Sequence, residues 1–229
     1  PLTINKAKPL LPIGGRPILD YIIEGIAEIP EVDTVYIVTN TKFYTDFINW
    51  RRSLHSNKEI VIIDDGTTDD ADKLGAIGDI GLVINKMSIK DDLLVLAGDN
   101  LFGFKLKKFT EFYKQSGLSI AVYKYPHKEE LPNYGIVELD NSGDVASFQE
   151  KPQFPKTNLV AVCLYAIPVS KLGLVHQYLS AGNNKDAPGY YLQWLVKKEK
   201  ISAFVFHEPW HDIGAPEEYE RVKEEYKNL

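Results

Sequence analysis

The stretch Leu93-Leu94-Val95-Leu96-Ala97-Gly98-Asp99-Asn100 is an almost uninterrupted apolar run that ends in small residues and a carboxylate. Such a run predicts a buried parallel strand, because a strand covered on both faces loses the alternation of polar and apolar residues. Ligands in open α/β sheets bind beyond the carboxyl ends of the strands. We therefore expect Asp99 to project into a functional site, and the alternative is an ordinary turn-forming Asp-Asn pair.

Outward from this run, the first 120 or so residues alternate short β-type runs with helical periodicity. This alternation predicts parallel strands joined by crossover helices. The candidate central strands are 34–38, 60–63 and 93–97, and Pro17 stands at the predicted start of a helix with an apolar face. The first half therefore predicts a doubly wound α/β arrangement.

The second half changes character at Asp140-Asn141-Ser142-Gly143, a strong hairpin signal between predicted strands at 135–139 and 145–150. Further elements are expected at 159–167, 170–179, 190–198, 201–206 and from Pro216 onward. The predicted fold is α/β: a Rossmann-like, mostly parallel mixed sheet flanked by helices, with antiparallel strands added in the second half. We expect one domain over residues 1–229, since this length suits a single α/β domain.

Composition narrows the function classes. Of 229 residues, 44% are hydrophobic and 25% charged, which is ordinary globular composition, and the net charge of −6 disfavours a nucleic-acid partner. No apolar run reaches the roughly 18 residues of a membrane-spanning helix, so we expect a cytoplasmic protein without membrane attachment. The single cysteine, Cys163, is expected to be a buried structural thiol. The oligomeric state is left open, including a homo-oligomer.

Three further motifs carry candidate chemistry. Asp212 lies in Trp210-His211-Asp212-Ile213-Gly214, just before a predicted helix, where it is either a turn residue or the second half of a metal clamp with Asp99. Glu150-Lys151-Pro152 ends the hairpin and offers a hydrogen-bond acceptor and a positive charge, or only a solvated strand end. Lys8, in Lys8-Pro9-Leu10-Leu11-Pro12, is likewise either a positive charge for a phosphate or only a solvated side chain.

The order of these motifs along the chain resembles that of the sugar-1-phosphate nucleotidyltransferases, particularly the glucose-1-phosphate thymidylyl- and uridylyltransferases. The resemblance covers nearly the whole chain. Pro1-Leu2-Thr3 followed by the Lys8 motif is similar to the end of the family's first signature, whose earlier Gly-x-Gly-Thr-Arg part is not in this sequence. We expect a strand and glycine-rich loop of the family to be missing from this chain. Two positions depart from the family pattern, Ala7 in place of proline and Ala215 in place of threonine.

The resemblance implies a set of site residues. Asp99 and Asp212 would hold catalytic Mg²⁺, Lys8 would contact the nucleotide phosphates, and Lys151 would bind the sugar phosphate. Further substrate contacts would come from segments containing Tyr134, Gly135 and Glu150 at the sugar, and Gly75 at the base.

The implied reaction joins a nucleoside triphosphate, with dTTP or UTP favoured, to a sugar 1-phosphate, with glucose 1-phosphate favoured, and releases pyrophosphate. A sugar phosphate has a second pKa of about 6, so it attacks as a dianion without a general base. Two alternatives stay open: a non-catalytic nucleotide-sugar-binding or regulatory protein, and a cytidylyltransferase acting on a phosphocholine-like acceptor.

His207-Glu208-Pro209-Trp210-His211 also matches the H-E-x-x-H pattern of zinc metalloproteases. That chemistry needs both histidines on one face of a helix, and Pro209 together with a preceding predicted strand argues against a helix. We expect no zinc site here.

Overall fold

A computed structural model describes residues 6–69 and 71–228. The chain forms two compact units. Unit 1 combines three separate stretches, the described parts of 1–73, 97–108 and 208–229, and unit 2 combines residues 74–96 and 109–207. The single domain expected from the sequence stays a prediction. The segment Pro1-Leu2-Thr3 lies outside the described residues.

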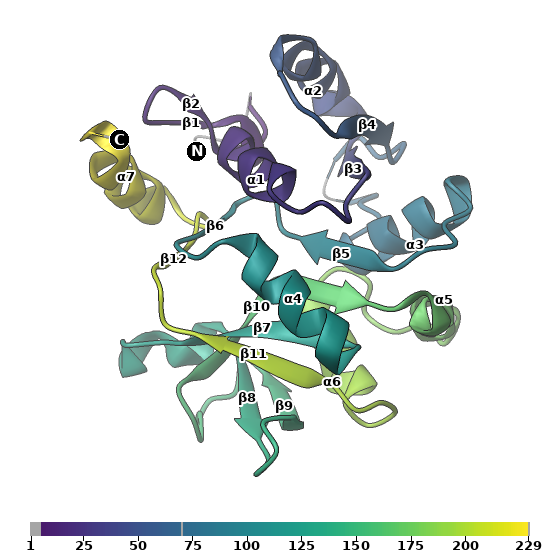
Figure 1. The fold of residues 1–229 in the computed structure, drawn as a ribbon, viewed down its shortest axis with the longest axis vertical. Helices are drawn as coiled ribbons and strands as arrows, with labels where there is room; N and C mark the ends of the chain where they lie inside the picture. The colour runs from purple at the N-terminus through teal and green to yellow at the C-terminus, as the bar shows by residue number, and fades with distance from the viewer. Residues whose placement is uncertain (1–5, 70, 229) are drawn as a thin grey trace. The chain divides into compact units, whose positions relative to one another are not determined.

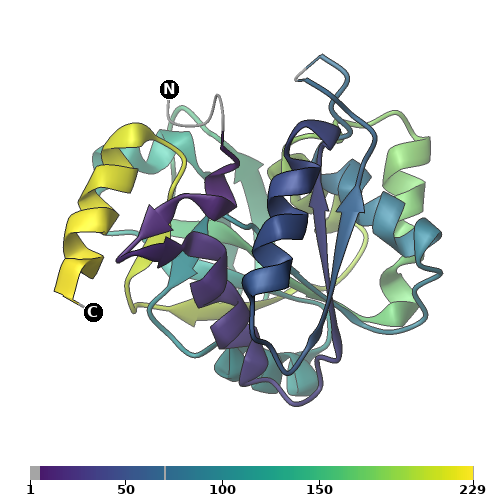
Figure 2. The same cartoon turned by 90° about the horizontal axis from the view of Figure 1, so that it is seen from above.

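Unit 1 contains small strand pairs and three helices of its own. Its elements are η1 (Lys8–Leu10), β1 (Pro12–Ile13), β2 (Arg16–Pro17), α1 (Ile18–Ala27), β3 (Thr34–Thr39), α2 (Thr41–Ser53), β4 (Glu59–Asp64), β6 (Asn100–Phe102), β12 (Trp210–Asp212), α7 (Pro216–Glu225) and η4 (Tyr226–Asn228). Strands β3 and β4 are parallel, and Figure 2 shows α2 running beside them. Helix α1 buries Ile18, Leu19, Ile22, Ile23 and Ile26, the apolar face that the sequence predicts.

Unit 2 is built on a six-stranded sheet (Figure 1). Its elements are α3 (Ala76–Lys86), β5 (Leu93–Leu96), β7 (Ser119–Lys124), η2 (Lys128–Asn133), β8 (Gly135–Leu139), β9 (Val145–Glu150), β10 (Leu159–Ile167), η3 (Val169–Lys171), α5 (Gly173–Ser180), α6 (Pro188–Leu195) and β11 (Ser202–Phe206), and α4 (Leu106–Ser116) begins in unit 1 and ends in unit 2. The strand order is β11-β7-β10-β8-β9, and β5 also pairs with β10.

The core of unit 2 lies between this sheet and helices α3, α5 and α6. Tyr178 and Tyr191 are 1% exposed there and meet edge to face, with ring centroids 5.1 Å apart. On β11, Ala203 belongs to this core, whereas the next residue, Phe204, contacts Phe109 of α4. Neighbouring residues of a strand point to opposite faces, so helices cover both faces of the sheet. The α/β class and the mixed sheet flanked by helices are confirmed.

Strand direction differs from the expectation at β5. Its pairing among the described residues is antiparallel to β10, with Leu96 opposite Leu164 and Leu93 opposite Ile167. A continuous apolar run marks burial on both faces, and an antiparallel strand in a covered sheet satisfies that condition equally well. Parallel pairing in the described residues is limited to β3–β4 and β7–β11. The antiparallel part is therefore larger than expected.

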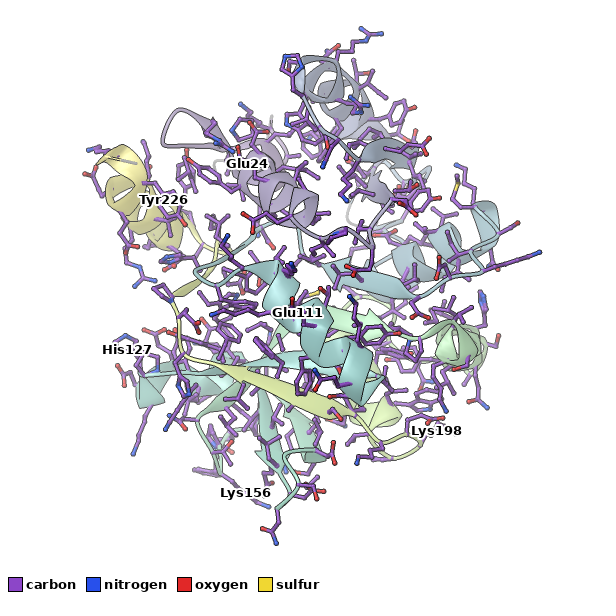
Figure 3. The ribbon with its side chains drawn as sticks, in the orientation of Figure 1. Glu24, Glu111, His127, Lys156, Lys198 and Tyr226 are labelled. Atoms are coloured by element: carbon purple, nitrogen blue, oxygen red, sulfur yellow. The ribbon has the colours of Figure 1, made fainter. Side chains whose placement is uncertain are left out.

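The second-half elements were predicted closely. The hairpin β8–β9 and strand β10 have the expected bounds, and Figure 3 shows Lys156 beside this hairpin, where its ammonium group lies 3.3 Å from Glu138. Cys163 is only partly buried on β10, since its neighbours leave it at the margin of the core. Within the described residues, no helix has the length and apolarity needed to cross a membrane.

Candidate active site

Strands β6 and β12 bring two carboxylates of unit 1 together. The strands are antiparallel, with Asp212 opposite Asn100, and the backbone N–H of Ile213 donates to the carbonyl of Asp99 at 3.0 Å. The side-chain Nδ2 of Asn100 donates to Asp99 Oδ1 at 3.1 Å and to Asp212 Oδ1 at 3.4 Å. One amide nitrogen thus contacts both carboxylates.

Lys8 lies beside this carboxylate pair. Its Nζ donates to the carbonyl of Gly214 at 3.2 Å and lies 3.7 Å from Asp99 Oδ2. The backbone approaches closely here, because a Cβ on Gly98 would lie 2.9 Å from Cγ of Pro9. Glycine at position 98 therefore lets the Lys8 segment pack directly against the chain that carries Asp99.

This cluster places two negative charges close together in a partly buried site. Burial raises the pKa of Asp212 to about 6, the charge of Asp99 adds to the rise, and Lys8 opposes it. A divalent cation would relieve the repulsion between two partly buried carboxylates. Mg²⁺ commonly takes one or two protein carboxylates and completes its octahedron with substrate phosphates and water. Among the described residues, no group of three acidic, histidine or cysteine side chains is arranged to hold a metal ion.

Unit 2 carries the other candidate residues. Among them, the Glu150 carboxylate lies against two glycines. A Cβ on Gly189 of α6 would lie 1.7 Å from Glu150 Oε2, and a Cβ on Gly135 would lie 3.1 Å from the same oxygen. The backbone N–H of Glu150 donates to Gln193 Oε1 at 3.2 Å. Burial raises the pKa of Glu150, and the charge of Lys151 opposes the rise. Two glycines therefore make room for this carboxylate.

Lys151 has an uncommon backbone conformation. Its φ is +47°, in the left-handed region that favours glycine, and its N–H donates to the carbonyl of Tyr134 at 3.1 Å. The Tyr134 hydroxyl lies 3.3 Å from that of Tyr125. Tyr134, Gly135, Glu150 and Lys151 thus gather at one end of the β8–β9 pair, where Gly135 is opposite Glu150.

Gly75 caps the N-terminus of α3. Its φ is +82°, and a Cβ there would lie 2.6 Å from the carbonyl oxygen of Lys185, which accepts the N–H of Ile77 at 2.9 Å. Only glycine fits this close approach. Among the predicted residues, unit 1 therefore contains Lys8, Asp99 and Asp212, and unit 2 contains Gly75, Tyr134, Gly135, Glu150 and Lys151.

Sequence reasoning did not single out Asn100, Gly189 and Gln193, which lie against these groups, or Trp210, which bonds to Asn100. Asn100 and Trp210 stand inside quoted motifs, so their position next to Asp99 and near Asp212 was the available signal. Gly189 and Gln193 lie against Glu150 because the fold packs helix α6 on strand β9, which the sequence does not indicate. The H-E-x-x-H match is not helical: His211 lies on strand β12 and Pro209 in the short irregular segment before it.

Comparison with known proteins assigns the family. The nucleotidyl transferase family profile matches residues 1–228, and the chain belongs to this family. The bifunctional protein GlmU of Methanocaldococcus jannaschii is 27% identical over 216 residues, 94% of this chain and 48% of that protein. A glucose-1-phosphate adenylyltransferase of Bacillus mycoides is 26% identical over 231 residues, covering 93% of this chain and 60% of that protein. The chain therefore spans about half the length of these relatives.

Solved structures show the same fold. A UDP-glucose pyrophosphorylase complexed with UDP-glucose superimposes with a TM-score of 0.79 over 100% of this chain and 93% of that one, at 20% identity. The resemblance to the sugar-1-phosphate nucleotidyltransferases is confirmed by the family match and the relatives found by sequence.

Proposed function

We propose that this protein transfers a nucleotidyl group from a nucleoside triphosphate to a sugar 1-phosphate and releases pyrophosphate. The observation that carries the proposal is the contact of one Asn100 amide with both Asp99 and Asp212, beside the Lys8 ammonium group. Two carboxylates and a lysine in this arrangement suit a triphosphate accompanied by Mg²⁺.

The reaction balances without a general base. An oxygen of the dianionic sugar phosphate attacks the α-phosphorus, a new phosphorus–oxygen bond forms, and the bond to the oxygen leading to the β-phosphorus breaks. When bound, Mg²⁺ would neutralise charge on the phosphates. Lys8 would bind the phosphate chain, Lys151 the sugar phosphate, and Glu150 would accept hydrogen bonds from sugar hydroxyls. The residues thus position and neutralise rather than transfer protons.

The substrates are proposed from the relatives and the resemblance together. One relative is named as a glucose-1-phosphate adenylyltransferase, and one solved structure is a UDP-glucose pyrophosphorylase with UDP-glucose. The two names differ in the nucleotide base and share the glucosyl phosphate. We therefore keep glucose 1-phosphate as the first acceptor to assay, with dTTP and UTP as the first donors. Tyr134 and Gly135 would lie along the sugar, and Gly75 along the base.

The test is pyrophosphate release by the native full-length protein over a matrix of nucleoside triphosphates and sugar 1-phosphates with Mg²⁺. Asp99→Ala or Asp212→Ala should abolish turnover while leaving the circular dichroism spectrum native. Asp46→Ala, an exposed aspartate of α2 in the same unit, is the matched control and should keep wild-type activity. Full activity in either site variant would refute the metal role assigned to that residue.

A further inference from the structure

The Asn100 side chain is buried and fully engaged. It is 3% exposed, its amide nitrogen contacts Asp99 and Asp212, and its Oδ1 accepts the indole N–H of Trp210 at 2.8 Å. An indole nitrogen can only donate, so its partner must be the oxygen of the amide. This bond fixes the amide orientation and directs both N–H groups of Nδ2 toward the carboxylates.

We propose that Asn100, oriented by Trp210, is a positioning residue that holds Asp99 and Asp212 at the separation a divalent cation needs. The inference rests on the proposed function, because it assigns the two carboxylates to the metal. Two nearby carboxylates repel each other in a partly buried site, and an amide that donates to both offsets this repulsion before a cation arrives. Burial leaves Asn100 no free group for substrate, so it acts through the two aspartates.

A purely structural role is the competing explanation. A buried Trp–Asn hydrogen bond also stabilises the β6–β12 pair, and its loss would lower stability without a specific effect on metal binding. Unit 1 offers a matched control for this possibility. Trp50 is 8% exposed, as Trp210 is, and its indole N–H donates to Asp20 Oδ1 at 2.7 Å. Trp50→Phe and Trp210→Phe therefore each remove an indole hydrogen bond from an equally exposed tryptophan, to a carboxylate in the first case and to an amide in the second.

Three variants separate the two roles. Trp210→Phe removes the bond that orients the amide together with part of a buried ring, and Asn100→Leu removes the amide at similar volume. The double variant Asn100→Leu/Trp210→Phe replaces both hydrogen-bonding partners with apolar groups, so it should recover part of the stability that Asn100→Leu loses. If Asn100 positions the carboxylates, metal affinity should stay low in the double variant even where the melting temperature recovers.

The experiment measures Mn²⁺ binding to the native full-length protein by electron paramagnetic resonance of the free ion, without substrate. Partners that orient metal ligands typically change affinity by about 10- to 100-fold, and we expect that loss in Trp210→Phe, Asn100→Leu and the double variant. Trp50→Phe should stay within about twofold of wild type. Melting temperatures and pyrophosphate release are recorded for the same proteins.

Each outcome decides the inference. It is overturned if the Asn100 and Trp210 variants bind Mn²⁺ like wild type, if Trp50→Phe weakens binding equally, or if the wild type binds no Mn²⁺. Wild-type turnover together with unchanged Mn²⁺ affinity in the variants would remove the inference and leave the proposed function intact. Binding of Mn²⁺ that depends on Asn100, with no pyrophosphate released from any substrate pair, would remove the proposed function alone.

Discussion

At the residue scale, Gly189 is the position where one methyl group should disturb the Glu150 carboxylate. The methyl carbon would lie 1.7 Å from Glu150 Oε2, and the end of this flexible side chain would move aside. A displacement near 1 Å can cost about 100-fold in turnover, so we expect Gly189→Ala to lower kcat/KM for the sugar 1-phosphate by about 10- to 100-fold. Unfolding free energy should change by less than about 1 kcal/mol, because alanine favours a helix.

Steady-state kinetics and urea unfolding would check this. Gly173→Ala is the control, since Gly173 also lies in a helix of unit 2 and a Cβ there meets nothing within 4 Å. Wild-type kcat/KM in Gly189→Ala would show that the position of the Glu150 carboxylate does not affect the reaction with the sugar 1-phosphate.

Some of the site residues could be predicted from the sequence and others could not. Asp99 and Asp212 stand at the ends of distinctive apolar or aromatic stretches, so their motifs could be found, and their roles remain predictions. Asn100 looked like half of a turn pair, and its bond to Trp210 depends on a strand pairing across 110 positions. Gly189 has no side chain to suggest contact, and only the fold brings Glu150 against it.

At the element scale, Asp144 ties the β8–β9 hairpin to the residues around β11. Its Oδ1 accepts the Ser202 hydroxyl at 2.7 Å and its Oδ2 lies 2.7 Å from Lys200 Nζ. The Lys200 bond, helped by Ser202, lowers the pKa of Asp144. A carboxylate with a lowered folded-state pKa stabilises the protein above its unfolded pKa of about 3.9, and this stability is lost as pH falls through the folded-state value.

We therefore expect Asp144→Asn to lower the unfolding free energy at pH 7 by about 1 kcal/mol, a modest value because Lys200 is exposed. Urea unfolding at pH 7 and near pH 3 should show the difference between wild type and variant shrinking at the lower pH. A difference that stays constant between the two pH values would rule out the charge of Asp144 as its source.

The elements themselves were largely predictable. The turn Asp140-Asn141-Ser142-Gly143 has one compatible geometry, with φ of +81° at Gly143, so the hairpin followed from local chemistry. Strand β10 is long and strongly apolar, so it could also be predicted as a strand from its sequence alone. The direction of β5 could not be predicted, because the partner that determines it, β10, lies far along the chain and apolar residues do not encode direction.

At the scale of the whole molecule, the candidate residues divide between the two units, and ligand effects should divide in the same way. Ions that bind Asp99 and Asp212 stabilise the segments carrying them, because binding to the folded state alone raises its stability. In hydrogen exchange, Mg²⁺ should slow exchange in 97–108 and 208–214, whereas sugar 1-phosphate should slow it in 135–151 and 188–193. Asp212→Asn should lose the Mg²⁺ response and keep the sugar phosphate response. A Mg²⁺ response confined to 135–151 would contradict this division.

The division into units was beyond sequence reasoning, because no linker, proline-rich stretch or change in composition marks the points where the chain passes between them. The α/β class was within reach, since alternating strand and helix signals reflect local burial that the residues themselves record.

The interrupted path of unit 1 has a consequence for biosynthesis. Asn100 leaves the ribosome 112 positions before Asp212, which at about 5 to 20 residues per second is a wait of about 6 to 22 seconds. All of unit 2 is translated by residue 207, before β12 and α7 exist. The nascent chain can thus complete unit 2 while β6 still lacks its partner strand, and the carboxylate pair assembles only after unit 2 has been translated.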